Sequence, residues 1–218
     1  MWQVDLHLHT RRSKDSLLTP DRLLAAARLA GMSRIAVTDH NSARAALELA
    51  EREPDYVIPG EEILTTRGEL LAYFIHDEVP SGLTPGVAIE RLRAQGAVIS
   101  VSHPFDRLRA GHWALRDLQA IAPHVDALEG FNARCIFAAD NARARAFALR
   151  SGLSMTAGTD AHAAWEVGRA GLDLPPFATA EELREALRHA SFFGRRAPWW
   201  VHFFSRYASL SKRLAPGG

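Results

Sequence analysis

The sequence predicts an α/β protein whose alternating strands and helices close into one barrel. Short apolar runs alternate along the chain with helical segments of roughly ten residues or more, which is the pattern of parallel βαβ units. About seven such units close more naturally into a barrel than into an open sheet. No Gly-x-Gly-x-x-Gly motif follows the first strand, which argues against an open sheet that binds a dinucleotide.

Capping signals place the helices within this pattern. Thr19-Pro20 offers an N-cap followed by proline at the first helical position, and Gly31 ends that helix. Thr84-Pro85 begins a later helix, which ends at Gly96. In chain order, strands are expected over residues 2–9, 34–38, 56–63, 69–75, 97–102, 127–131 and 154–159, and helices over residues 20–30, 42–52, 85–96, 137–150 and 180–189.

Length and composition favour a single domain. A chain of 218 residues, of which 47% are hydrophobic, can bury one sizeable core. We expect one barrel domain over residues 1–190, followed by an aromatic and basic C-terminal tail over residues 191–218 that packs on the barrel. The only cysteine, Cys135, excludes an internal disulfide and a cysteine-rich zinc site.

The charge balance and the N-terminus bear on partners and location. The formal net charge of +1 gives no electrostatic reason to expect a membrane partner or a stable nucleic-acid complex. The chain shows no signal peptide and no long apolar run, so a cytoplasmic protein is expected. The oligomeric state is not predicted.

Histidines gather at the carboxyl ends of the predicted strands, the rim that carries the chemistry of an α/β barrel. They are His7, His9, His40, His103 and His162, and the acids nearby are Asp5, Asp15, Asp39, Glu61, Glu62, Glu129 and Asp160. A lone His-x-His pair is a weak signal, although residues i and i+2 of a strand share a face. Burying the whole set without a cation would cost several kcal/mol for each group. Imidazole and carboxylate suit zinc, manganese and ferrous iron, so the set predicts a metal site.

One class of metal hydrolase can be set aside. A His-x-His on the first strand and an aspartate at the last strand also describe the amidohydrolase superfamily, whose binuclear members often bridge their metals with a carboxylated lysine. The only lysines here are Lys14, in the first loop, and Lys212, near the C-terminus. Neither lies in a mid-barrel strand, so that version is excluded.

The complete motif series resembles the PHP family, named for polymerase and histidinol phosphatase domains. The motifs follow the family's order from residue 5 to residue 162. The tracts Asn132-Ala133-Arg134 and Glu166-Val167-Gly168 further resemble the small stand-alone phosphoesterases of the family. The matching stretches are Asp5-Leu6-His7-Leu8-His9-Thr10, Ser13-Lys14-Asp15-Ser16, Val37-Thr38-Asp39-His40-Asn41, Pro59-Gly60-Glu61-Glu62-Ile63, Ser102-His103-Pro104 and Gly158-Thr159-Asp160-Ala161-His162.

The resemblance implies a distorted (β/α)7 barrel that holds two or three divalent ions, Mn²⁺, Fe²⁺ or Zn²⁺. Carried over residue by residue, the ligands of the first metal would be His7, His9, Glu62 and Asp160. Those of the second would be Glu62, as a bridge, and His103, and those of the third would be Asp15, His40 and His162.

The ligand roles of Glu69 and of the adjacent Glu61–Glu62 pair follow less simply from the family pattern. Many family members have a histidine where this chain has Glu69. A glutamate can ligate as a harder donor, which favours manganese or iron over zinc, or it can lie outside the ligand shell and leave the second metal weak or absent. Of the adjacent pair, Glu62 fits the family's Gly-x-Glu pattern, and Glu61 would point to the other face, where an arginine could pair with it.

The function implied is hydrolysis of a small phosphate ester, a nucleotide or a phosphorylated metabolite, by a metal-activated water. Arg134, which would reach a phosphate from the rim, and Lys14 are the expected phosphate-binding residues. Asp39 or His162 would protonate the leaving group, or Asp39 would orient a metal-bound imidazole. The loop from Asp106 to Trp113 is expected to line the cleft.

Two other classes stay open. The domain could be a polymerase-associated module of the proofreading type, although no polymerase segment is attached in this sequence. It could also be a non-catalytic metal-binding scaffold, although the near-complete ligand series weighs against loss of function.

Overall fold

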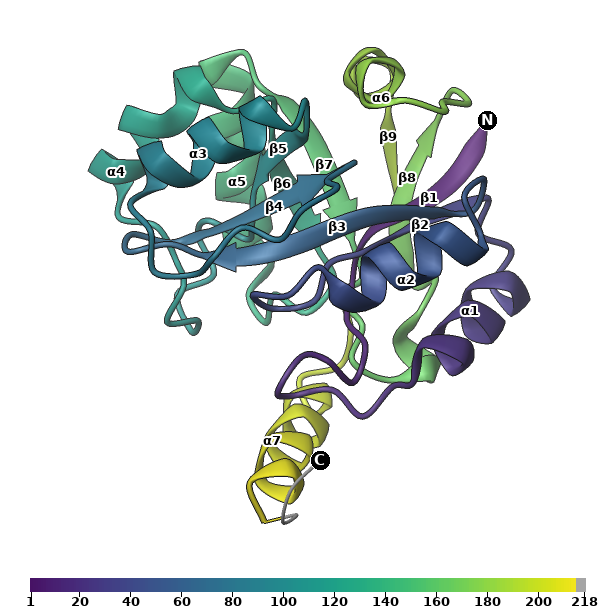
Figure 1. The fold of residues 1–218 in the computed structure, drawn as a ribbon. Coiled ribbons are helices and arrows are strands. Elements are labelled where there is room, and N and C mark those ends of the chain that lie inside the picture. The colour runs from purple at the N-terminus through teal and green to yellow at the C-terminus, as the bar shows by residue number, and fades with distance from the viewer. Residues whose placement is uncertain (215–218) are drawn as a thin grey trace.

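In the computed structural model, which describes residues 1–214, one nine-stranded sheet forms the centre of a single α/β domain (Figure 1). The strand order is β7-β6-β5-β4-β3-β2-β1-β8-β9. The strands are β1 (Trp2–Leu8), β2 (Arg34–Val37), β3 (Val57–Leu64), β4 (Glu69–Tyr73), β5 (Val98–Val101), β6 (Ala127–Asn132), β7 (Ser154–Gly158), β8 (Ala170–Leu174) and β9 (Ser191–Gly194). The helices are α1 (Pro20–Leu29), α2 (Arg44–Arg52), α3 (Pro85–Ala94), α4 (Leu115–Ile121), α5 (Ala138–Ser151), α6 (Ala180–Leu187) and α7 (Val201–Leu214), with short 3-10 turns η1 (Ala122–His124) and η2 (Ala164–Glu166).

The sheet nearly closes between β1 and the residues that follow β7. The Asp160 N–H donates to the His7 carbonyl at 2.7 Å, and the His9 N–H donates to the Ala161 carbonyl at 3.0 Å. The antiparallel partner β8 pairs with the first residues of β1 only, from Trp2 to Val4. The carboxyl end of β1 is therefore free to meet β7, and the predicted α/β barrel is confirmed.

One strand departs from the parallel pattern and distorts the barrel. Strand β4 is antiparallel to both β3 and β5. The connection between β3 and β4 is too short to contain a crossover helix, so the two strands form a hairpin that pairs Leu64 with Glu69. This hairpin returns Glu69 to the same end of the barrel as Glu62.

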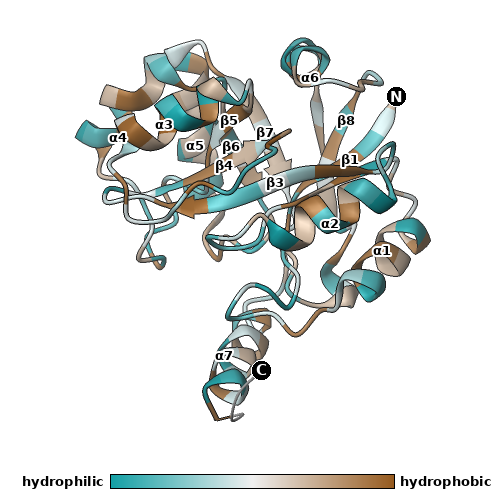
Figure 2. Ribbon diagram, in the orientation of Figure 1, coloured by the Kyte–Doolittle hydropathy of each residue, from teal (hydrophilic) through white to brown (hydrophobic). Residues whose placement is uncertain are grey.

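Both faces of β1 are buried. Its side chains alternate between the faces, so that apolar residues lie on one face and titratable residues on the other. Leu6 and Leu8 are buried in the apolar core, and the alternating Asp5 and His7, followed by His9 directly after the strand, are equally buried. In Figure 2 the strands are largely hydrophobic, and the helices that cover them carry hydrophilic residues as well. A polar, fully buried strand face needs partners, and the next elements of the barrel supply them.

The C-terminal segment differs from a simple tail. Strand β9, of four residues, extends the sheet into the segment predicted as tail. Helix α7 follows and projects from the end of the barrel, beside the loop after β1 (Figure 1), where Lys212 Nζ donates to the carbonyls of Arg11 and Ser13 at 2.5 and 2.6 Å. Residues 215–218 of the predicted tail lie outside the described residues. Among residues 1–214, no helix has the length and apolarity needed to cross a membrane.

Candidate metal centre

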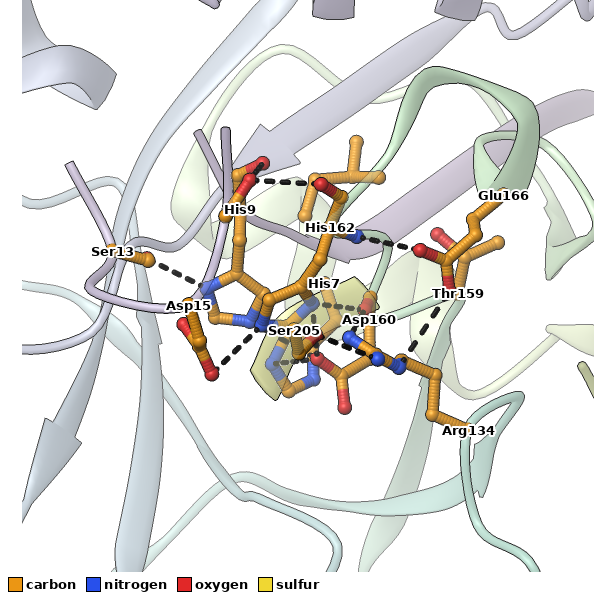
Figure 3. Close-up of polar contacts among 12 residues, drawn as sticks. His7, His9, Ser13, Asp15, Arg134, Thr159, Asp160, His162, Glu166 and Ser205 are labelled. Atoms are coloured by element: carbon orange, nitrogen blue, oxygen red, sulfur yellow. Dashed lines mark hydrogen bonds and ion pairs between the residues drawn. The ribbon is translucent and has the colours of Figure 1, made fainter. Parts of the chain in front are cut away.

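Four side chains from three parts of the barrel converge on one point at its carboxyl end (Figure 3 labels three of them). They are His7 from β1, His9 directly after β1, Glu62 from β3, and Asp160 after β7. His9 Nε2 lies 3.1 Å from Asp160 Oδ1, and the Nε2 atoms of His7 and His9 lie 3.3 and 3.5 Å from Glu62 Oε2. Among residues 1–214, these four converging atoms have no hydrogen-bond partner. Buried polar atoms that meet without partners fit a bound cation, so the predicted first metal site suits the residues present.

The backbone conformation of Asp160 helps to place its carboxylate in the site. Asp160 has φ of 56°, in the left-handed region that few residues other than glycine occupy, although aspartate tolerates it. The turn lets the Asp160 N–H bond to β1 while its carboxylate points at His9. Strand closure and ligand placement thus depend on the same residue.

A second group of candidate ligands lies beside the first. Asp15 Oδ2, from the loop after β1, lies 3.2 Å from His162 Nε2 and 3.6 Å from His40 Nε2. His9, His40 and His162 also present ligand atoms within 4.8 Å of one another. The residues predicted for the third metal are therefore brought together.

The predicted second metal position differs from the other two because an arginine side chain also reaches it. His103 Nε2 lies 2.9 Å from Glu62 Oε1 and 3.5 Å from Glu69 Oε2, so Glu69 does reach the cluster. A guanidinium reaches it too: Arg109 Nη1 lies 3.2 Å from His103 Nε2, and Nη2 donates to Asp160 Oδ2. The residues at this position include a fixed positive charge, which a metal site does not require.

Neighbouring groups orient the imidazoles. His7 Nδ1 lies 2.8 Å from Glu129 Oε1, and His9 Nδ1 lies 3.0 Å from Ser13 Oγ. These bonds leave the Nε2 atoms directed at the centre, an arrangement common around metal-ligating histidines. Their sequence positions did not reveal these roles, since Ser13 lies in a loop and Glu129 stands out only as an acid at a strand end.

The charges of the cluster also favour a cation. Burial lowers the pKa of His7, yet the negative charges of Glu62 and Glu129 outweigh burial and raise that pKa well above its ordinary value. Burial and the neighbouring His40 lower the pKa of His9 to about 4. Carboxylates that draw positive charge onto a buried imidazole are typical of a site built around a cation, and a neutral His9 is ready to ligate.

The two residues predicted to protonate the leaving group are placed differently. Asp39 accepts hydrogen bonds from the backbone N–H and the hydroxyl of both Thr10 and Ser13, with the Thr10 N–H at 2.7 Å and the Ser13 hydroxyl at 2.6 Å. A carboxylate saturated by donors favours the alternative role, in which Asp39 orients His9 through Ser13. Burial and Arg134 lower the pKa of His162 to about 3, which favours the neutral form that a ligand requires.

The predicted phosphate-binding residues meet in one cavity of about 290 Å³ beside the cluster. Lys14 and Arg134 both line it. Arg134 was expected to reach a phosphate from the rim, but it is only 3% exposed. Its Nη2 donates to Ser205 Oγ at 2.8 Å and to the Val201 carbonyl at 3.2 Å, and its Nε lies 3.5 Å from Glu166 (Figure 3). Arg134 therefore ties helix α7 to the site, a contact that its motif alone does not reveal.

A larger cavity of about 670 Å³ adjoins the first and shares Asp15, Arg109, His202 and Ser205 with it. Helix α7 forms one wall of this cavity. The loop after β5, which was expected to line the cleft, contributes Asp106, Leu108 and Arg109. The residues from α7 were not predicted to line the cleft, because only the fold brings them there. Those beyond the shared set are Asp106, Leu108, Ile136, Arg206, Ser209, Leu210 and Arg213.

Glu61 points away from the cluster, as predicted, but its expected arginine partner was wrong. Its Oε2 accepts the Val79 N–H at 2.9 Å, and within residues 1–214 no ion pair joins it to an arginine. Burial raises the pKa of Glu61 to about 8, and the nearby Glu78 adds to this effect. Glu61 is thus largely protonated at neutral pH, in contrast to Glu62, whose pKa its histidine neighbours hold well below the ordinary value despite burial.

This protonation predicts a pH-dependent stability. Because the folded pKa of Glu61 lies above the unfolded value of 4.5, the folded protein binds the extra proton, and stability falls as the pH rises from about 4.5 to about 8. Glu61→Gln, which cannot ionise, should be more stable than the wild type at pH 9 by on the order of a few kcal/mol. Chemical denaturation at pH 5 and pH 9 should show the difference shrinking at the lower pH. Glu90→Gln, an exposed control on α3, should change neither value, and an equal effect at both pH values would contradict the prediction.

The fold and the cluster define an α/β barrel protein with a histidine–carboxylate centre suited to divalent ions. The model of the PHP domain matches residues 5–71, and the model of the PHP-associated region matches residues 138–192. An uncharacterized protein of Methanocaldococcus jannaschii is 35% identical over 171 residues, which are 77% of this chain and 68% of the relative. The chain belongs to the PHP family.

Solved structures share the fold. A two-domain Bacteroides vulgatus protein, described as containing a predicted PHP-like metal-dependent phosphoesterase, superposes with a TM-score of 0.70 at 20% identity. The match covers 89% of this chain but 65% of that one, so this chain spans less than two thirds of that protein. PsfC of Pseudomonas syringae superposes with a TM-score of 0.69 at 23% identity and covers 96% of this chain and 98% of its own.

Proposed function

We propose that this protein is a metal-dependent phosphoesterase that hydrolyses a small phosphate ester. The proposal rests on four buried atoms, of His7, His9, Glu62 and Asp160, that have no hydrogen-bond partner among residues 1–214. They converge beside a cavity lined by cationic side chains. The family membership and the description of the Bacteroides vulgatus protein support the same reaction class.

The candidate ligands fall into two groups, each of which would hold one metal ion. His7, His9, Glu62 and Asp160 would hold one ion, and Asp15, His40 and His162 another. Bound divalent ions would acidify a water molecule and neutralise charge on the phosphate. Around them, Glu129 and the Ser13–Asp39 pair keep the imidazoles oriented, and Lys14 attracts the phosphate into the cavity.

The cavities suggest the size of the substrate. Volumes of about 290 and 670 Å³ fall near the range that small-molecule ligands occupy. The larger cavity offers Arg206 and Arg213 for polar groups and Leu108 and Leu210 for an apolar surface. A nucleotide or a phosphorylated metabolite fits this mixture, with helix α7 as the wall that contacts the part of the substrate beyond the phosphate.

A substrate panel tests the proposal. Protein stripped with a chelator and reloaded with Mn²⁺, Fe²⁺ or Zn²⁺ would be offered phosphomonoesters, nucleoside bisphosphates, cyclic phosphodiesters and short oligonucleotides. We expect turnover of at least one class by metal-loaded protein and none by stripped protein. Metal binding without turnover of any class would overturn the proposal and favour a non-catalytic scaffold, whereas turnover of oligonucleotides alone would favour a proofreading-type module.

A further inference from the structure

Arg109 enters the candidate metal centre from the loop between β5 and α4. Its guanidinium contacts two candidate ligands, with Nη1 3.2 Å from His103 Nε2 and Nη2 donating to Asp160 Oδ2. Its Nε donates to Asp106 Oδ2 at 3.2 Å, and Asp106 is itself buried. A planar guanidinium that is held on three sides is a fixed charge, because arginine does not lose its proton in proteins.

The loop that carries Arg109 is fastened to the same part of the sheet. The Glu69 N–H donates to the Gly111 carbonyl at 3.2 Å. A Cβ at Gly111 would lie only 2.2 Å from Glu69 Oε2, so any larger residue here would have to displace the Glu69 carboxylate. Contact with Glu69 therefore holds Arg109 close to the second metal position.

The charges around Arg109 match one positive group at this position. Glu62, Glu69 and Asp160 all present carboxylates close to His103 or to the guanidinium. A divalent ion bound between His103, Glu62 and Glu69 would lie in contact with the guanidinium, and like charges at that distance repel strongly.

We propose that Arg109 supplies the positive charge at the second position, so that the chain binds about two divalent ions, at the first and third positions, in place of three. Glu69 then balances the charge of this region, where the resemblance to the PHP family leads us to expect a histidine ligand. Arg109 lines both cavities, so its free N–H groups are placed to contact the oxygens of a bound phosphate. This inference deepens the proposed function, because it concerns the same site.

Metal stoichiometry tests the inference without any assay of turnover. Chelator-stripped protein would be dialysed against excess Mn²⁺, and bound manganese would be measured by mass spectrometry per mole of chain. We expect about two ions for the wild type, and about three for the double variant Arg109→Met/Glu69→His, which removes the charge and restores an imidazole. Arg109→Lys, which keeps a cation, and Arg206→Met, which removes another arginine of the same cavity, should both retain about two.

The wild type alone can overturn the inference, even if a variant fails to fold. Three ions bound to the wild type, or an unchanged stoichiometry in a folded double variant, would show that Arg109 does not replace a metal. The outcome is independent of the proposed function. A protein that binds about two ions and hydrolyses no phosphate ester would leave the inference standing and remove the function, and an active protein with three ions would do the reverse.

Discussion

Glu62→Gln should lower the turnover of a phosphate ester by about 10³-fold or more and should strip metal from the protein. Glu62 Oε2 lies 2.9 Å from His40 Nδ1 and 3.3 Å from His7 Nε2, while its Oε1 lies 2.9 Å from His103 Nε2. Glutamine has the same shape but no charge, and its amide N–H₂ group would face positions that a cation or an imidazole occupies. Initial rates with a substrate from the panel, together with manganese content, measure both effects.

The neighbouring glutamate provides the matched control. Glu61 has the same side chain one residue earlier, yet it points away and is largely protonated at neutral pH. Glu61→Gln should therefore keep turnover and metal content within about twofold of the wild type. Equal losses in the two variants would mean that the wrong glutamate has been placed in the metal centre.

The second large effect concerns metal and stability. Saturating Mn²⁺ should raise the midpoint of thermal unfolding by roughly 8–16 °C, since an ion at a thousand times its Kd adds about 4 kcal/mol and a chain of this size gains about 2–4 °C for each kcal/mol. The physical reason is that carboxylates such as Glu62 and Asp160 are completely buried among histidines, where a cation relieves their repulsion. Calorimetry of stripped protein with and without Mn²⁺ measures the shift.

Two variants sharpen this measurement. Asp160→Asn should lose most of the shift, because Asp160 Oδ1 faces His9 Nε2 at 3.1 Å in the predicted first site. His124→Gln, an exposed histidine outside the cluster, should keep all of it. An identical shift in Asp160→Asn and in the wild type would place the stabilising ion elsewhere.

Much of the fold followed from local patterns, and its exceptions have physical causes. Capping residues such as Thr19 and apolar runs such as Val98–Val101 mark elements without help from the rest of the chain. Strand β8 was missed because Ala170–Leu174 contains a glycine and an aspartate and owes its strand form to pairing with β1 and β9. The antiparallel direction of β4 depends on the hairpin and not on its own composition.

The candidate site likewise contains residues that the sequence alone could predict and residues that depend on tertiary contacts. His7, His9, Asp160 and their partners could be proposed because strand ends of a barrel meet at one rim, whatever the connecting loops do. Arg109 could not, because its position depends on the Glu69–Gly111 contact between two loops distant from each other in the sequence. Arg134 was expected at the rim and is buried instead, because α7 lies over it.

Anomalous X-ray diffraction from crystals grown with Mn²⁺ would locate the ions of the candidate metal centre. Data collected at the manganese absorption edge should show a peak about 2 Å from the Nε2 atoms of His7 and His9, shared with the carboxylates of Glu62 and Asp160. We also expect a peak beside Asp15 and His162, and the Arg109 guanidinium at the remaining position. A protein that hydrolyses a phosphate ester but shows no peak between His7, His9, Glu62 and Asp160 would contradict the proposal that these four residues hold a catalytic metal ion.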